Sequence, residues 1–209
     1  MARFMSKKVI LTMGLALVLA AGGVATASNM GFKFVKNYTA IKPQSNTLSL
    51  PYFQSQFVNA SNLWTDIGAA GTEVCRLNAN ESRDCWTGSS FNDFAIVPQN
   101  GLIIRILAPA KTEVIVGSHD PSLALDLTKV KPQTNFKSLP YHMTYTSASQ
   151  IWLDLPSHTN GVTEVCRLNA NESRDCWTGS SFNDWSTVIG DAVIIRNNVS
   201  TNTWVPDHY

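Results

Sequence analysis

The chain has 209 residues, with 16 Lys and Arg against 15 Asp and Glu, which gives a formal net charge of +1. Hydrophobic residues make up 44% of the chain, an ordinary proportion for a globular protein. A charge so close to zero lacks the basic surface of nucleic-acid-binding proteins and the polybasic clusters that hold proteins to anionic lipid. We therefore expect no nucleic-acid partner.

The N-terminal segment has the three parts of a secretory signal peptide. Arg3, Lys7 and Lys8 precede an apolar run over 9–24, and Ala25-Thr26-Ala27 supplies the small-x-small pattern of a cleavage site. The alternative is a retained anchor, but the run is short for a bilayer, which requires about 20 apolar residues. No later stretch is long and apolar enough to span. We expect residues 1–27 to be removed, leaving a protein that is secreted or at the cell surface, with no membrane span.

The rest of the chain contains one segment twice. Residues 72–93, TEVCRLNANESRDCWTGSSFND, recur letter for letter at 163–184, and the flanks match more loosely. Self-similarity over about 90 residues indicates two tandem domains rather than a solenoid of short repeats. We place domain 1 at 28–119 and domain 2 at 120–209, with the junction in the stretch 117–122, which contains Gly, Asp-Pro and Ser.

Each copy is expected to contain several strands and one short helix. In the first copy these are, in chain order, an entry strand at 32–41, a strand around 49–52, a helix at 60–67, a hairpin of 72–77 with 83–88, and strands at 102–107 and 112–116. The second copy has its entry strand at 123–130 and its helix at 148–155. The predicted fold class is mainly β, with two tandem small β-sandwich or partly open barrel domains, each with one short helix and a disulfide-bridged hairpin.

Two cysteines lie in each copy, with nine residues between them: Cys75, Cys85, Cys166 and Cys176. In an exported protein an even number of cysteines indicates disulfides. The repeat favours Cys75–Cys85 and Cys166–Cys176, because each copy then closes itself and the paired cysteines face each other across a hairpin with a loop at 78–82. Zinc is the alternative, but one Cys pair without CxxC spacing or a nearby His is a weak ligand set.

The duplicated segment offers little catalytic chemistry. It contains Glu73, Glu81, Arg83 and Asp84 but no histidine, and the chain has no G-x-S-x-G motif. Glu81 and Asp84 are expected to be solvated charges near the hairpin tip rather than the carboxylate pair of a glycosidase. We therefore expect no catalytic residue, metal site, cofactor or enzymatic activity.

Two features could still bind a ligand. Asp93 and its counterpart Asp184 could hold calcium, but their spacing does not match an EF-hand, and a turn with side-chain-to-backbone hydrogen bonds is favoured. The chain also has six tryptophans, whose faces could stack on sugars or could instead pack in the cores. Trp86 and Trp177 directly follow a cysteine, so strand alternation places them on the face opposite the disulfide. A polysaccharide is therefore a possible partner.

The entry strands suggest a way of assembling. Phe32, Phe34 and Tyr38 are evenly spaced and require burial. If the strand at 123–128 completes copy one, copy two lacks an equivalent, and the N-terminal strand of another molecule could supply it. Such head-to-tail contacts build a homopolymer. The alternative is that each entry strand belongs to its own domain and the protein is a monomer.

The progression of Ser-Leu-Pro-Tyr, a short helix, Val-x-Arg and Gly-x-x-Ile resembles tandem β-domain repeats of secreted bacterial surface and filament proteins, over most of each copy. The resemblance implies an extracellular, non-catalytic role and transfers no functional residue. The expected function is a structural subunit of an extracellular filament or surface assembly built by strand addition. The alternative is a monomeric carbohydrate-binding or adhesive surface module.

Overall fold

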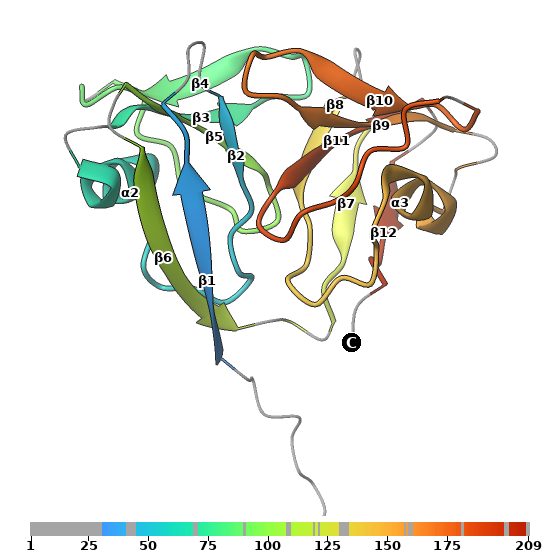
Figure 1. Ribbon diagram of the computed structural model, residues 1–209, viewed down its shortest axis with the longest axis horizontal. Coiled ribbons are helices and arrows are strands. Elements are labelled where there is room, and N and C mark those ends of the chain that lie inside the picture. The colour runs from blue at the N-terminus through green and yellow to red at the C-terminus, as the bar shows by residue number, and fades with distance from the viewer. Residues whose placement is uncertain are drawn as a thin grey trace, which may run out of the picture. The chain divides into compact units, whose positions relative to one another are not determined.

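The computed structural model (Figure 1) describes residues 31–40, 45–68, 71–89, 91–107, 110–118, 120, 122–129, 134–156, 158, 161–180, 182–198 and 201–207. The predicted signal segment, 1–27, lies outside these residues, and so does the side chain of Phe32. None of the helices in the described part of the chain is long and apolar enough to cross a membrane.

The two halves of the chain contain the same elements in the same order. The first half contains β1 (Gly31–Tyr38), β2 (Asn46–Leu48), α2 (Ala60–Ile67), β3 (Gly71–Leu77), β4 (Arg83–Trp86), β5 (Leu102–Ile106) and β6 (Lys111–Ser118). The second half contains β7 (Leu125–Leu127), β8 (Thr134–Ser138), α3 (Ala148–Asp154), β9 (Val162–Leu168), β10 (Arg174–Trp177), β11 (Ala192–Asn197) and β12 (Asn202–Trp204).

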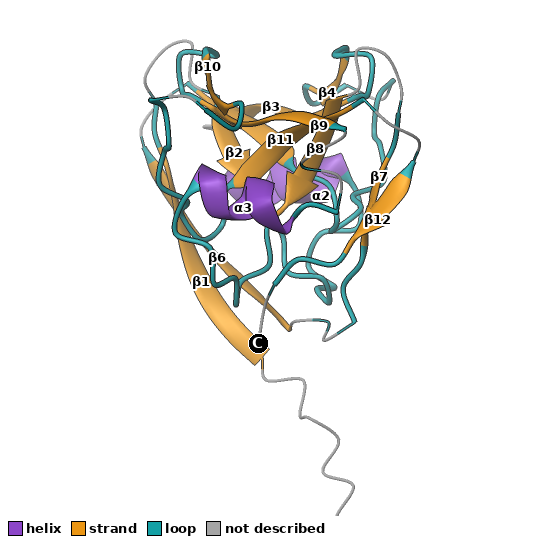
Figure 2. Cartoon of the chain, turned by 90° about the vertical axis from the view of Figure 1, so that its right-hand side faces the viewer, coloured by secondary structure: helices purple, strands orange, loops and turns teal. Residues whose placement is uncertain are grey.

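Each half has a four-stranded antiparallel sheet and a two-stranded antiparallel ribbon. The sheet orders are β2-β5-β3-β4 and β8-β11-β9-β10, and the ribbons are β1-β6 and β7-β12. Figure 2 shows the helices α2 and α3 on the same side of the four-stranded sheets as the ribbons. The predicted fold class, mainly β in two halves with one short helix each, is confirmed, and the sheets of the described residues do not close into a barrel.

The entry strands pair within their own halves. In β1-β6, Phe34 lies opposite Ile115, and in β7-β12, Leu125 lies opposite Trp204. The expectation that the strand at 123–128 completes copy one, leaving copy two without a strand, is therefore wrong. The reason is that each copy's own last strand offers the backbone partner, and this pairing buries Tyr38 and Leu125 in the core of the same half.

The strand expected around 49–52 is also displaced. The observed strand, β2, precedes it and pairs with β5. Pro51 has no N–H group to donate to a ladder. The Ser49 N–H instead donates to the Gly190 carbonyl at 2.8 Å, and its hydroxyl donates to the Asp191 carbonyl at 2.6 Å. The chain leaves the sheet at this point because its polar groups bond to the other half.

The four-stranded sheets are buried on both faces. On β3, Val74 points into the core of the first half, whereas Cys75 faces a separate apolar cluster that both halves share. On β5, Leu102 and Ile104 belong to the half's own core and Ile103 to the shared cluster. The shared cluster consists of Cys75, Ile103, Phe136, Cys166, Leu168, Ala192 and Ile194. An uninterrupted apolar run such as Leu-Ile-Ile is typical of strands covered on both sides.

The halves are in close contact at Gly101 and Ala192, which occupy equivalent positions in the two copies. A Cβ atom on Gly101 would lie 2.4 Å from the Ala192 Cβ and 2.9 Å from the Phe136 ring. Neighbouring carbon atoms cannot approach this closely. At this meeting point, only one copy can carry a side chain.

We predict that Gly101→Ala destabilises the fold by about 1–3 kcal/mol, because it overpacks the contact between the halves. Gly31→Ala is the control, since its Cβ would meet only the Gly117 carbonyl oxygen at 3.8 Å. Urea unfolding measures both variants. Adding Ala192→Gly to Gly101→Ala should restore part of the loss. Equal stability of the two single variants would contradict this account of the interface.

Candidate functional site

The duplicated segments form two hairpins, each closed by a disulfide. Cys75 and Cys85 lie directly opposite each other on β3 and β4, as do Cys166 and Cys176 on β9 and β10, and both pairs are bonded as predicted. Glu73 Oε2 lies 3.5 Å from Cys75 Sγ, which creates a carboxylate and sulfur cluster. Because the sulfur atoms are bonded to each other, they are not available as thiolate ligands for a metal ion.

Each hairpin ends in a tight tip that presents a glutamate. Glu81 and Glu172 have φ angles of 67° and 66°, an uncommon conformation for residues other than glycine. In the second tip, the Ser173 N–H and hydroxyl both donate to the Asn171 side chain, at 3.1 and 2.6 Å. The same bonds recur in the first tip. The tips are thus preformed and hold their glutamates in fixed directions.

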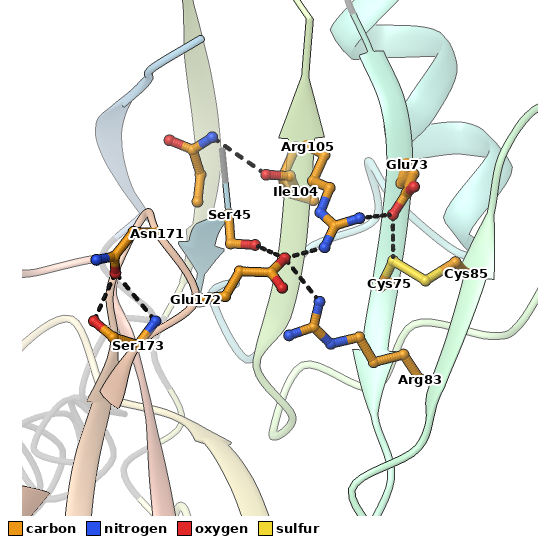
Figure 3. A network of polar contacts seen from close by, with 11 residues as sticks. Ser45, Glu73, Cys75, Arg83, Cys85, Ile104, Arg105, Asn171, Glu172 and Ser173 are labelled. Carbon is orange, nitrogen blue, oxygen red and sulfur yellow. Dashed lines mark hydrogen bonds and ion pairs between the residues drawn. A yellow bond between two sulfur atoms is a disulfide. The ribbon is translucent and has the colours of Figure 1, made fainter. Parts of the chain in front are cut away.

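Each glutamate reaches into the opposite half, as Figure 3 shows for Glu172. Its Oε1 atom accepts hydrogen bonds from the Ser45 hydroxyl at 2.8 Å, from Arg83 Nη1 at 3.0 Å and from Arg105 Nη2. Arg105 also pairs with Glu73 at 3.0 Å, so the glutamate joins a network rather than a single ion pair. Side chains far apart in the sequence meet here because the two sheets lie face to face.

The same contact is made in the opposite direction. Glu81 Oε1 accepts from Thr134 at 2.9 Å, from Arg174 at 2.9 Å and from Arg196 at 2.8 Å, and Arg196 pairs with Glu164 at 2.6 Å. These residues occupy the positions equivalent to those around Glu172. The halves are therefore related by approximate twofold symmetry. Each half supplies one glutamate, which we call the finger, and one pair of arginines that binds the other half's glutamate, which we call the socket.

The expectation that Glu81 is a solvated charge is therefore wrong. Hydrogen bonds from Arg174, against the opposing effect of burial, lower the pKa of Glu81 to about 2. Burial raises the pKa of Glu172, but bonds from Ser45, Arg105 and Arg83 outweigh it, and the result is again about 2. A carboxylate with so low a pKa is ionised at neutral pH, so it has no proton to donate and is only a weak general base. Its role here is to hold the halves together.

Asp84 lies outside this network. It accepts from its own hairpin's Arg76 at 2.8 Å, an exposed contact that Arg167 and Asp175 repeat in the second half. Hydrogen bonding from Arg76 lowers the pKa of Asp84. Exposed pairs of this kind contribute little to stability.

The loop after each hairpin is held in place at both of its ends. In the first half, Gly88 has a φ of 89° and packs so closely on the Trp64 ring that an added Cβ would lie 3.1 Å from it. At the other end, Asp93 accepts from the Ser61 N–H at 2.9 Å and the Ser61 hydroxyl at 2.6 Å, at the first turn of α2. Asp184 binds Ser149 in the same way. Asp93 and Asp184 thus bond to backbone and hydroxyl groups, as the predicted turn requires.

Between these fixed points each loop exposes a phenylalanine. Phe91 is 90% exposed and Phe182 is fully exposed. Beside Phe182, an open pocket of about 240 Å³ is lined by Arg167, Asp175, Asn183, Asp184 and Trp185. The pocket therefore combines an aromatic face with amide, carboxylate and guanidinium groups.

The tryptophans do not provide stacking surfaces. All six are buried or partly buried and belong to, or pack against, the core of their own half. Trp86 and Trp177 lie opposite the disulfides, as alternation predicted, and the disulfide face is covered by the other half. The exposed aromatic residues of the repeat are Phe91 and Phe182, which sequence reasoning missed because a phenylalanine is normally assigned to the core.

The predicted assembly residues contact their own chain. Tyr38 is buried in the first core, and Phe34 packs against Tyr141 of the second half with ring centroids 4.9 Å apart. Phe32 lies on β1, and its side chain is not among those described.

A scan against protein-family models and searches of curated proteins and of solved structures found no match to the chain.

We predict that the double variant Glu81→Gln/Glu172→Gln loses about 1–3 kcal/mol of stability at pH 7, because each change leaves arginines facing a neutral group. Since folding lowers these pKa values from 4.5 to about 2, their contribution is present above pH 4.5 and is lost as pH falls toward 2. Urea unfolding at pH 7 and at pH 2.5 should show that the difference in unfolding free energy between wild type and variant is smaller at the lower pH.

Asp175→Asn is the control for this prediction, since it breaks an exposed pair within one half and should cost about 0.5 kcal/mol or less. A gap between wild type and double variant that stays constant from pH 7 to pH 2.5 would refute the role given to the two glutamates, as would a control that is equally damaging.

Proposed function

We propose that the mature protein is a secreted, non-catalytic surface module that presents two identical loops for binding an extracellular polysaccharide. The observation that carries this proposal is the pair of exposed phenylalanines, Phe91 and Phe182, which lie at equivalent positions between the glycine and aspartate contacts of their loops. Two disulfides and the predicted signal peptide support an extracellular location.

The pattern of identity between the copies supports a role for these loops. Buried positions next to the repeat differ, such as Phe94 and Trp185, or Leu63 and Ile151, yet the exposed residues of 87–93 are the same at 178–184. The contact between the halves accounts for the cysteines and the glutamates. It does not account for a fully exposed phenylalanine, because a side chain in solvent tolerates substitution.

The chemistry of the loop suits a sugar. A phenylalanine face offers apolar area for the C–H groups of a pyranose ring, while the side chains of Asn183, Asp175 and Arg167 offer donors and acceptors for hydroxyl groups. The hydrogen bonds from Ser61 to Asp93 and from Ser149 to Asp184 anchor one end of each loop before a ligand arrives, which lowers the entropy cost of binding. Two sites on one chain can bind a polymer with more avidity than either site alone.

We predict that Phe91→Ala and Phe182→Ala each weaken retention on an immobilised polysaccharide panel, and that the double variant loses retention by about 100-fold or more. Phe53→Ala is the control, because Phe53 is 47% exposed but lies outside the repeated loops. Circular dichroism verifies folding of each variant. Retention of the double variant at the wild-type level would exclude the loops as the binding site.

A second candidate function is self-assembly into a homopolymer, the role of a structural filament subunit. The observation that favours it is the outer face of the β1-β6 ribbon, where Val35, Val114 and Val116 are 51%, 40% and 56% exposed. Since β1 is paired with β6, assembly by strand addition requires β1 to leave this ribbon, whereas assembly through the apolar face does not.

Negative-stain electron microscopy of residues 28–209 tests this second function. We predict filaments from the wild type and discrete particles from Val35→Lys/Val116→Lys, because two lysines would place charge on an apolar contact. Val58→Lys, at another exposed valine, is the control and should still form filaments. Discrete particles from the wild-type protein would rule out assembly under those conditions.

A further inference from the structure

A second pocket lies where the first hairpin meets β8 of the other half. Its volume is about 230 Å³. The polar side chains that line it are Arg76, Asn78, Asn100, Thr128, Thr134, Asn135 and Lys137, and Leu77, Ala79 and Phe136 complete the wall. No carboxylate is among the lining residues, so the pocket presents cationic, amide and hydroxyl groups only.

Lys137 is the unusual member of this set. It is only 9% exposed, and its Nζ atom donates to the Asn100 side chain at 3.2 Å. All fifteen Asp and Glu residues of the chain are among the described residues, and none of them forms an ion pair with Lys137 there. Burial lowers the pKa of Lys137, because it penalises the charged form, and the charge of Asp126 opposes this shift only in part.

The other charged groups near the pocket neutralise one another. Arg76 pairs with Asp84 at 2.7 Å. Glu81, which bonds to the pocket residue Thr134, is already engaged by Arg174 and Arg196. Lys137 is therefore the pocket's cation that forms no ion pair with any of the described residues.

The approximate twofold symmetry supplies an internal comparison. Asn100 of the first copy corresponds to Asp191 of the second, and each carbonyl accepts a hydroxyl bond from the equivalent serine, Ser138 or Ser49. Asp191 pairs with Lys36 of β1 at 2.5 Å, whereas the position equivalent to Lys137 itself is occupied by Leu48. On the Lys137 side the carboxylate is replaced by an amide. The lysine beside Asp191 is thus paired with a carboxylate, whereas Lys137 is bonded to an amide.

We propose that this pocket binds the oxyanion group of a ligand, a carboxylate, sulfate or phosphate, beside Lys137. Lys137 supplies the charge. Asn100, Asn78 and the pocket's hydroxyl groups supply polar contacts around the anion. Its volume admits an inorganic anion or a single acidic sugar residue. This inference is independent of the phenylalanine loops.

The test measures anion binding to the mature protein by isothermal titration and thermal unfolding, with sodium sulfate, sodium phosphate and an oligogalacturonate as probes at constant ionic strength. The wild type should bind at least one probe, and its unfolding midpoint should rise with probe concentration up to about 50 mM. Lys137→Gln should weaken binding at least about 10-fold, the change expected when one charged contact is lost.

Asn100→Asp is the sharper variant, because it reproduces the carboxylate of Asp191 and should abolish anion binding while the protein remains at least as stable. Lys33→Gln, which removes an exposed lysine on β1, is the charge-matched control and should bind like the wild type. Binding of all three probes would identify a site for small free anions, and binding of the oligogalacturonate alone would assign it to acidic polysaccharide. No binding by the wild type, or unchanged binding by Lys137→Gln and Asn100→Asp, would overturn the proposal.

Discussion

The fold depends on the fact that each four-stranded sheet is buried on two faces. Val74 and its neighbours on one face pack on the half's own helix and ribbon, while Cys75 and Ile103 on the other face pack against the equivalent surface of the second half. A half on its own would leave the disulfide face, with its apolar neighbours, in water. The reciprocal glutamates close the border of this interface and fix its register, since each fits only among the arginines of the opposite half.

The sequence predicted correctly those features that residues close together in the chain decide. The letter-for-letter repeat predicted two similar halves, and the Cys spacing around a turn predicted the pairs Cys75–Cys85 and Cys166–Cys176. Alternation along β4 correctly placed Trp86 opposite the disulfide. The cysteine and tryptophan inferences concern residues within one hairpin, where backbone geometry decides which side chains are neighbours.

The determinants that the sequence did not reveal are long-range. The partners of Glu81 lie about 50 to 115 positions away, so no local pattern marks it as paired. The strand near Pro51 was misplaced because its hydrogen-bonding partners belong to the other half. One signal was present: the apolar run Leu102-Ile103-Ile104 has no polar alternation, which indicates a strand covered on both sides. It does not identify what covers the second face.

The two copies also differ where symmetry could not be kept or was not required. Gly101 faces Ala192 because two side chains cannot occupy one point near the symmetry axis. The equivalent aspartates Asp66 and Asp154 have different neighbours. In the first half, burial and then Asp66 raise the pKa of the core-facing Glu113 to about 7. In the second half, Asp154 accepts a hydrogen bond from Trp204. Such differences make the halves chemically distinct while the shared backbone plan is retained.

The reciprocal finger-and-socket contact has a consequence for the origin of the chain. One copy carries both the glutamate finger and the arginine socket, so a gene that encoded a single copy would specify a self-complementary surface and a twofold homodimer. The folded state of that dimer would depend on how much protein was present. Joining the copies through the residues that follow Ser118 turns the same contact into an intramolecular one, which is independent of concentration. In dilute solution, the fusion therefore keeps the interface formed, where two separate copies would dissociate.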